Sequence, residues 1–466
     1  MISIPVIAIF DIGKTNKKCF LLDEQYQIVL ERSEQFEEIS DEDGDACDDV
    51  QRLTQWVEES LTEILQLENF DVKAVNFSAY GASLVYINEA GEVIAPLYNY
   101  LKTYPETIKN ELYNKYGGAE KISCETASPV LGSLNSGMQL YRMKVEKPEL
   151  YEQIKYALHL PQYISFLISR KAYSDITSVG CHTQLWDYQK NLYHHWVVAE
   201  GLEKKLAPLQ SSGETDILNY KGKILHTGIG LHDSSAALIP YLAVFKEPFV
   251  LISTGTWCIS LNPFNHEPLT VAELAQDCLC YMEYQDRPVK ASRLFAGQDH
   301  ELQTKRLSAH FNTAADAYKE IKYNGALVQE LKNKFNFDTP VTAGDNISGS
   351  AFQTREPDGF KNYEEAYHCL MLDIMQQQLH ATKLVLTGSP VNRIFVDGGF
   401  SNNPVYMHLL AMAFPALEVY AASVAQATAM GAALAVHKAW NKMPVPADMV
   451  KLKYYKIVDS PDQGVM

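Results

Sequence analysis

The sequence has few cysteines and no cluster of them. Eight cysteines are scattered over 466 residues, and only Cys278 and Cys280 lie close together. A CxC pair alone is a poor signature for zinc or redox chemistry, and the scatter gives no disulfide framework. We therefore expect reduced thiols and a cytoplasmic location.

Long apolar runs and basic tracts are also missing. The apolar segment 6–10 has no basic residues before it and meets an acid at Asp11, so it predicts a buried strand and not a secretion signal. No stretch approaches the roughly 20 apolar residues of a membrane helix, and we expect no membrane partner. The formal net charge is −17, and no basic tract offsets it. This argues against a nucleic-acid partner, because that affinity depends on clustered Lys and Arg.

What is present is typical of a globular α/β protein. With 466 residues the chain is too long for one hydrophobic core, which predicts two large domains, 1–240 and 241–466, although no flexible linker separates them. The acidic stretch 37–49 is expected to be a solvated loop. Apolar patterning predicts strands over 6–10, 18–22, 27–32, 74–78, 249–253 and 393–397, and helices over 50–67 and about 403–414.

A first glycine turn follows the N-terminal strand and reads Asp11-Ile-Gly-Lys-Thr-Asn16. An acid at a strand end, then a glycine that lets backbone approach a ligand, suits a phosphate and its Mg²⁺. The turn predicts Asp11 as the metal residue, and Gly13, Lys14, Thr15 and Asn16 as phosphate contacts. A plain β-hairpin stays open as the alternative. The spacing is not that of a Walker loop.

A second turn, Ser253-Thr-Gly-Thr-Trp257, lies between two expected strands. A tight hairpin tip of small hydroxyl residues donates hydrogen bonds well to a terminal phosphate. It predicts Thr254, Gly255 and Thr256 as nucleotide contacts, although such a segment alone is also typical of an ordinary turn.

A third turn, Asp397-Gly-Gly-Phe-Ser-Asn402, joins a strand to a helix. The glycine pair leaves room for a flat ring or a phosphate on the backbone, and the positive end of the helix faces the same space. It predicts Gly398, Gly399 and Asn402 as nucleotide contacts. A turn with glycines kept for packing is the alternative.

These three turns in this order, with the segment Ala425–Leu434, resemble the carbohydrate kinases of the FGGY family over nearly the full length. That family lies within the actin, hexokinase and heat-shock-protein ATPase fold. The resemblance implies two actin-like (ribonuclease H-like) domains, each with a mixed five-stranded sheet, and a cleft between them. It also implies ATP and Mg²⁺ as cofactors and a small sugar as the phosphoryl acceptor.

The segment Gly230-Leu-His-Asp-Ser-Ser-Ala-Ala237 is similar to the family element that supplies the catalytic base, which implies this role for Asp233. An alcohol is a poor nucleophile at neutral pH, so a carboxylate within hydrogen-bond reach helps it to attack phosphorus. Asp233 also suits a plain helix N-cap, and both roles are compatible. His232 is either a substrate contact or a structural hydrogen-bond partner.

The sugar pocket departs from the family pattern. The segment 76–86 takes the place of the first substrate strand, which implies Ala79, Tyr80 and Gly81 as substrate residues. Tyr98 and Asn99 stand where relatives often carry Trp-x-Asp-x-Arg, and the usual aspartate and arginine are missing. Tyrosines suit an altered pocket, because they combine an apolar ring with a polar tip. Packing in the core is the alternative.

Trp257 and the segment Arg293–Gly297 look more like rhamnulose or fuculose kinases than xylulose or glycerol kinases. A 6-deoxy-ketohexose is the first expectation, with its primary hydroxyl as acceptor, and a ketopentose is the second. Two other hypotheses remain: a chaperone-like or filament ATPase, and a non-catalytic sugar or nucleotide sensor. A homodimer is left open.

Overall fold

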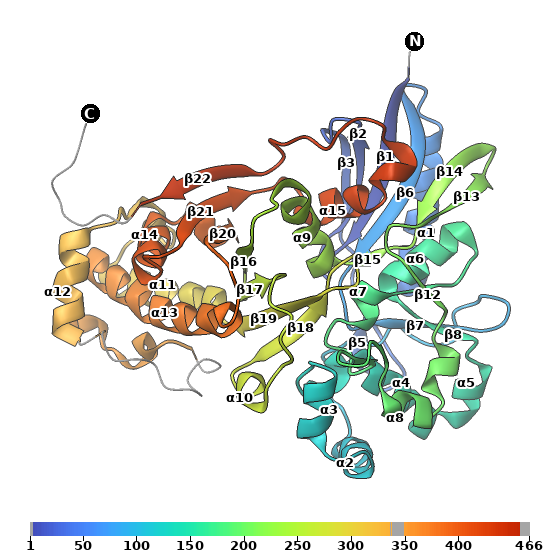
Figure 1. Cartoon of the computed structure of the whole chain (residues 1–466), viewed down its shortest axis with the longest axis horizontal. Coiled ribbons are helices and arrows are strands. Elements are labelled where there is room, and N and C mark those ends of the chain that lie inside the picture. The colour runs from blue at the N-terminus through green and yellow to red at the C-terminus, as the bar shows by residue number, and fades with distance from the viewer. Residues whose placement is uncertain (1–2, 336, 338–348, 457–466) are drawn as a thin grey trace.

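The computed structural model describes residues 3–335, 337 and 349–456. Two large mixed β-sheets with helices packed on them form the two halves of the molecule (Figure 1). The predicted α/β class with two sheet-containing domains is confirmed. Each sheet has seven strands among the described residues, not five, because hairpins and short strands extend its edges.

The first sheet is built on a buried parallel pair, β1 and β6, with the order β13-β14-β6-β1-β2-β3 and with β15 also paired to β6. Val6 to Phe10 of β1 are fully buried, which explains why this strand reads as a continuous apolar run. The strands are β1 (Ile4–Ile12), β2 (Lys17–Asp23), β3 (Ile28–Glu34), β6 (Phe70–Ala79), β13 (Thr215–Tyr220), β14 (Lys223–Gly228) and β15 (Leu231–His232).

The second sheet has the order β18-β19-β17-β16-β20-β21-β22. Its central strands β16 and β20 run parallel, and both end in the glycine turns predicted from the sequence. The strands are β16 (Phe249–Thr254), β17 (Cys258–Asn262), β18 (Cys278–Met282), β19 (Pro288–Leu294), β20 (Arg393–Gly398), β21 (Glu418–Ser423) and β22 (Lys451–Tyr455).

Helices of the first half include α1, which begins after Asp49, whose side chain accepts a hydrogen bond from the Arg52 backbone N–H. Smaller strands complete this half: β4 (Ile39–Ser40), β5 (Ala46–Cys47), β7 (Leu84–Ile87), β8 (Tyr156–His159), β9 (Ser174–Asp175), β10 (Trp186–Asp187), β11 (Leu192–Tyr193) and β12 (Leu209–Gln210). The helices are α1 (Val50–Leu65), α2 (Glu106–Lys115), α3 (Ala119–Glu125), α4 (Ser136–Glu146), α5 (Pro148–Gln153), α6 (Leu160–Ser169), α7 (Ile176–Val179) and α8 (His195–Ala199).

Helices of the second half are α9 (Asp233–Val244), α10 (Val271–Leu274), α11 (Ala296–Phe311), α12 (Gly325–Phe335), α13 (Tyr363–Leu386), α14 (Pro404–Ala413), α15 (Ala427–Ala435) and α16 (His437–Trp440). The long helix α13 packs against β17 and β19, and its inner face forms much of the second core. Within the described part of the chain, no helix combines the length and apolar character needed to cross a bilayer.

Two helices, α9 and α15, lie where the halves meet (Figure 1). A Cβ at Gly431 of α15 would clash with the Ala236 carbonyl oxygen of α9, so the helices cross with their backbones in contact. Helix α15 also packs against β1 and β6, which brings the C-terminal part of the chain back to the first sheet. The predicted boundary at residue 240 falls inside α9 and stays a prediction.

Candidate active site

One edge of the first sheet brings Asp11 and Asp233 together. Asp11, near the end of β1, is opposite Ser78 of β6, and Ser78 is opposite Leu231 of β15. Asp233 follows β15 directly and begins α9, so it emerges at the same edge as Asp11. The structure thus places the predicted metal residue and the predicted base side by side.

Both carboxyl groups hold protons more strongly than an ordinary aspartate. Burial raises the pKa of Asp233 to about 6. Two hydrogen bonds to Asp233 Oδ1 act to lower this pKa: one from the Ser234 backbone N–H at 2.6 Å and one from the Ser234 hydroxyl at 3.3 Å. Burial also raises the pKa of Asp11 to about 6, against a hydrogen bond from Thr428, and the charge of Asp233 adds to this rise. The Asp233 side chain is 32% exposed, which leaves it open to a substrate.

The buried His232 side chain contacts the Asp233 carboxylate. Its Nε2 lies 3.1 Å from Asp233 Oδ1, and its ring stacks on Tyr281 with the centroids 5.9 Å apart. Burial lowers the pKa of His232 to about 3, so the ring is neutral at physiological pH. The structure therefore favours a supporting role for His232.

The first glycine turn is a tight hairpin between β1 and β2. The Gly13 N–H donates to the Asn16 carbonyl at 2.9 Å, and Thr15 and Asn16 are exposed at its tip. Lys14 does not extend freely from this tip. Its Nζ donates to Asp48 at 2.6 Å and to Glu38 at 2.7 Å. Two carboxylates thus neutralise the Lys14 ammonium group in this structure, and its phosphate contact stays a prediction.

The second and third turns are joined through Thr254. Its hydroxyl donates to the Asp397 carbonyl at 2.6 Å and accepts from the Phe400 N–H at 3.0 Å. Gly398 has φ 89°, and a Cβ there would clash with the Thr254 carbonyl oxygen, so this position requires glycine. The Tyr241 hydroxyl of α9 donates to the Asp397 carboxylate at 2.7 Å. The helix that begins with Asp233 is thus fixed to the third turn.

A cavity of about 660 Å³ opens beside these two turns. This volume lies in the range typical of small-molecule sites. Its lining includes Thr254, Gly255, Gly399 and Asn402; Thr256 and Gly398 are their direct neighbours in the chain. Further lining residues that the sequence reasoning missed are His300, Lys305, Tyr318 and Lys319. They come from α11 and the segment after it, which carry no local motif.

The end of β6 carries the predicted sugar residues Ala79 and Tyr80, followed by Gly81. The buried Tyr80 hydroxyl donates to Asp48 at 2.7 Å, and its ring packs edge-on against Tyr100 at 6.0 Å. Burial opposes ionisation of Asp48, but hydrogen bonds from Lys14 and Tyr80 outweigh it and lower the pKa of Asp48. Asp48 and Tyr100 were not predicted, and both contact Tyr80.

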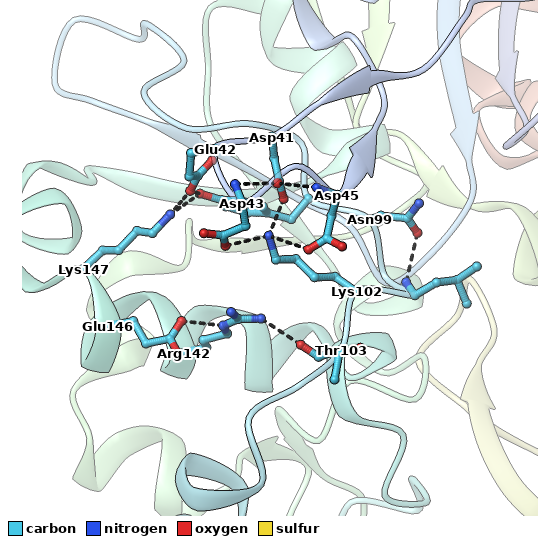
Figure 2. A network of polar contacts seen from close by, with 12 residues as sticks. Asp41, Glu42, Asp43, Asp45, Asn99, Lys102, Thr103, Arg142, Glu146 and Lys147 are labelled. Carbon is cyan, nitrogen blue, oxygen red and sulfur yellow. Dashed lines mark hydrogen bonds and ion pairs between the residues drawn. The ribbon is translucent and has the colours of Figure 1, made fainter.

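Tyr98 and Asn99 lie near a different network, and Figure 2 shows Asn99 beside it. The Lys102 ammonium is surrounded by Asp41, Asp43 at 2.8 Å and Asp45 at 3.0 Å. Tyr98 bonds to Glu42 and Lys147, and the Asn99 side chain accepts from the Leu101 N–H.

These two residues line a small cavity with Arg142, whereas Tyr100, the next residue along, packs on Tyr80. Residues 37–40 and 42–46 of the acidic stretch are exposed as expected, but the Asp41 side chain is fully buried.

The residues that surround the His232 ring were not predicted as site residues. Cys181, His182 and Tyr281 surround the His232 ring, and Arg293 lies close behind them. Arg293 makes two hydrogen bonds to Asp277, at 2.6 and 3.0 Å, and lies over the Trp257 ring.

The donor groups fit the cofactors that the sequence implied. Two partly buried carboxylates with raised pKa values, at the same edge of the sheet, make a site where a cation is favoured, and carboxylate oxygens are ligands that Mg²⁺ prefers. The cavity beside the second and third turns is lined by Gly255 and Gly399 and by the start of α14, whose Val405 and Tyr406 N–H groups are capped by the Asn403 side chain.

Solved structures of similar fold cover almost the whole chain. A carbohydrate kinase from Novosphingobium aromaticivorans is 22% identical with a TM-score of 0.80, over 98% of this chain and 95% of its own. A ligand-bound xylulose kinase from Lactobacillus acidophilus is 14% identical with a TM-score of 0.77, over 97% and 94%. At these identities the likeness shows the fold.

A curated relative is the rhamnulokinase of Halalkalibacterium halodurans, 21% identical over 274 residues. The match covers 56% of this chain and 57% of that relative.

Two family models match in succession. The N-terminal domain of the FGGY family of carbohydrate kinases matches residues 6–225, and the C-terminal domain of carbohydrate kinase FGGY matches residues 246–444. Together they cover most of both sheets and include Asp11, whereas Asp233 lies between the two matched ranges. The chain belongs to the FGGY family of carbohydrate kinases.

Proposed function

We propose that this protein transfers the γ-phosphoryl group of ATP to a primary hydroxyl of a small ketose, with Asp233 as the general base. The observation that carries the proposal is the environment of Asp233. Its carboxylate is adjacent to Asp11, has a pKa raised to about 6, and remains 32% exposed. A base of this pKa is ionised at neutral pH yet accepts a proton more readily than an ordinary aspartate.

The nucleotide would occupy the 660 Å³ cavity. Gly398, Gly399 and Asn402 would lie around the nucleoside, and the turn of Thr254, Gly255 and Thr256 around the terminal phosphates. Gly13, Thr15 and Asn16 would close over the phosphates from the other lobe. Asp11 would hold Mg²⁺, which when bound neutralises charge on the transferring phosphate.

In the transfer step, Asp233 accepts the proton of the sugar hydroxyl as that oxygen attacks the γ-phosphorus. His232 is neutral and close to Asp233, so it orients the carboxylate without competing for the proton. Such general-base assistance contributes about 10² to 10⁴ in rate. Positioning and charge neutralisation supply the rest.

A 6-deoxy-ketohexose such as rhamnulose or fuculose is the proposed acceptor, with a pentulose as the alternative. The rings of Tyr80 and Tyr100 pack together beside the site and offer apolar surface of the kind that a methyl group contacts. The similarity to a rhamnulokinase supports the first choice, and the similarity to a xylulose kinase keeps the second.

The test is a screen of ketoses, polyols and aldoses in a coupled ADP-release assay with the full chain. L-Rhamnulose or L-fuculose should give the highest kcat/KM. ADP release that does not depend on any sugar would favour the ATPase hypothesis. No release with any acceptor, together with retained ATP binding, would favour a sensor. Activity with aldoses alone would contradict the ketose assignment and leave the kinase assignment intact.

A further inference from the structure

A thiol and two imidazoles meet beside the proposed base. Cys181, His182 and His232 each offer one ligand atom, and these atoms all lie within 4.8 Å of one another. Cys181 Sγ lies 3.3 Å from His232 Nε2, which in turn lies 3.1 Å from Asp233 Oδ1. Cys181 and His232 are buried, whereas His182 and Asp233 are partly exposed and give access to the group.

Hydrogen bonds alone do not satisfy the two ring nitrogens of His232. His232 Nε2 faces a thiol and a carboxylate at once, but a single ring nitrogen either donates one proton or accepts one. His232 Nδ1 is buried and has no hydrogen-bond partner among the described residues, so the second nitrogen offers no relief. A cation beside these atoms would use the nitrogen lone pair and the sulfur together.

His182 has the arrangement typical of a metal ligand. Its Nδ1 lies 3.2 Å from the Leu134 carbonyl oxygen, to which it can donate, and this leaves Nε2 with its lone pair. Metal-binding histidines commonly donate their other N–H to a carbonyl or carboxylate in this way. A Cβ at Gly81 would lie 2.8 Å from His232 Nε2 and 3.8 Å from His182 Cε1. Glycine at this position therefore keeps the space beside both rings free of a side chain.

We propose that Cys181, His182 and His232 form a three-ligand binding site for a thiophilic divalent transition metal, Zn²⁺ above all. Zn–N bonds of about 2.0 Å and Zn–S bonds of about 2.3 Å place tetrahedral ligands roughly 3.3 to 3.5 Å apart. The separation of 3.3 Å between Cys181 Sγ and His232 Nε2 is close to these values. Sulfur and imidazole ligands also separate this site from the oxygen site that Mg²⁺ requires.

Occupancy of the site inhibits the kinase. A cation bound to His232 Nε2 attracts the Asp233 carboxylate, which lies 3.1 Å from that nitrogen and accepts the substrate proton, so a bound ion opposes catalysis. This consequence depends on the proposed role of Asp233, whereas binding of the metal does not. Binding and inhibition are therefore measured separately.

A second group, Glu125, His194 and His195, serves as an internal control. His194 Nε2 lies 2.8 Å from Glu125 Oε2, and its Nδ1 accepts from the Trp196 N–H at 3.3 Å. Both ring nitrogens of His194 thus have structural partners already. A metal that binds this group would have to break them.

The binding test uses ZnCl₂ and the full chain after removal of metal by a chelator. Competition with a chromophoric chelator should show one tight site per chain, and CoCl₂ should give an absorption band from sulfur-to-metal charge transfer. Cys181→Ala should lose that band and weaken Zn²⁺ binding at least about 10-fold, since even supporting contacts to a metal ligand contribute that much. His182→Asn should weaken binding without a sulfur change and replaces Cys181→Ala if that variant does not fold. His195→Asn and Cys124→Ser should bind as the parent does.

Equal Zn²⁺ affinity in the parent and in both Cys181→Ala and His182→Asn would overturn the site, as would a loss confined to His195→Asn. For inhibition, each variant is compared with its own metal-free rate on the acceptor found in the screen. The parent should lose activity at Zn²⁺ concentrations that leave His182→Asn active, and a chelator should restore it. Zn²⁺ binding at Cys181 without inhibition would retain the metal site and contradict the role of Asp233.

Discussion

The Thr428 hydroxyl donates a 2.7 Å hydrogen bond to the Asp11 carboxylate, and the two residues lie 417 positions apart in the sequence. Thr428 belongs to α15, which packs against β1 and β6 of the first sheet. The C-terminal part of the chain thus fixes the orientation of the acid at the first glycine turn. The site depends on contacts between the two ends of the sequence.

Removal of this hydrogen bond should weaken the proposed Mg²⁺ site. Thr428→Val keeps the volume but leaves Asp11 without its donor, which should raise the pKa of Asp11 further and destabilise the fold by about 1 kcal/mol. The Mg²⁺ concentration for half-maximal rate should rise several-fold. Thr428→Ser keeps the hydroxyl and should behave as the parent does. An unchanged Mg²⁺ dependence in Thr428→Val would argue against Asp11 as the metal residue.

Replacement of the base should stop turnover and spare nucleotide binding. Asp233→Asn removes the proton acceptor, and kcat should fall by about 10² to 10⁴. ATP affinity, measured by calorimetry, should change little because the proposed nucleotide cavity is lined by other residues. Ser234→Ala, which removes only the hydroxyl that lies 3.3 Å from Asp233, is the matched control and should retain most activity. Parent-like turnover in Asp233→Asn would rule out the proposed base.

The raised pKa of Asp233 predicts an acid limb in the rate profile. The base works only when ionised, so kcat/KM should fall about tenfold per pH unit below about 6, and not below the ordinary aspartate value near 4. Protonation of a carboxyl whose pKa is raised by folding favours the folded state, so these groups add stability as the pH falls from 6 toward 4. Circular dichroism should therefore show folded protein where activity is already lost. A limb near pH 4 would contradict the assignment.

Loss of the Lys102 ammonium should destabilise the loop in Figure 2. Lys102→Met leaves the buried Asp41 carboxylate without its cation, at a cost of about 2 to 3 kcal/mol in the free energy of unfolding. The urea midpoint should fall accordingly. Lys155→Met breaks an ion pair with the exposed Glu89 and should change stability by less than about 0.5 kcal/mol. Similar losses in the two variants would show that the Lys102 network contributes no more than a surface pair.

The sequence was sufficient for the features that lie in consecutive residues. The strand-plus-glycine turns, the start of α9 at Asp233 and the α/β class all follow from local pattern, and the order of the turns indicated the family. The contacts of Lys14 and Tyr98 were not predicted, for a different reason. Their partners Asp48 and Glu42 lie 34 and 56 residues away, and no local pattern predicts which acid a lysine or tyrosine will contact.

The acidic stretch illustrates the same limit. Charge alone predicts exposure for residues 37–49, because burying a carboxylate is costly unless a partner neutralises it. Lys102 is that partner, and only the folded chain brings it within reach of Asp41. His182 was likewise invisible, since its significance comes from its distance to His232 and not from its neighbours in the sequence.

The close crossing of α9 and α15 at Ala236 and Gly431 gives the molecule a pivot. Each helix carries one tether to the site: Tyr241 of α9 bonds to Asp397, and Thr428 of α15 bonds to Asp11. Rotation of one sheet relative to the other about this crossing would move both of these hydrogen bonds, because both helices take part in the crossing. A bulkier residue at 431 would push the two helices apart and shift Asp397 and Asp11 together, although residue 431 is not itself a proposed ligand contact.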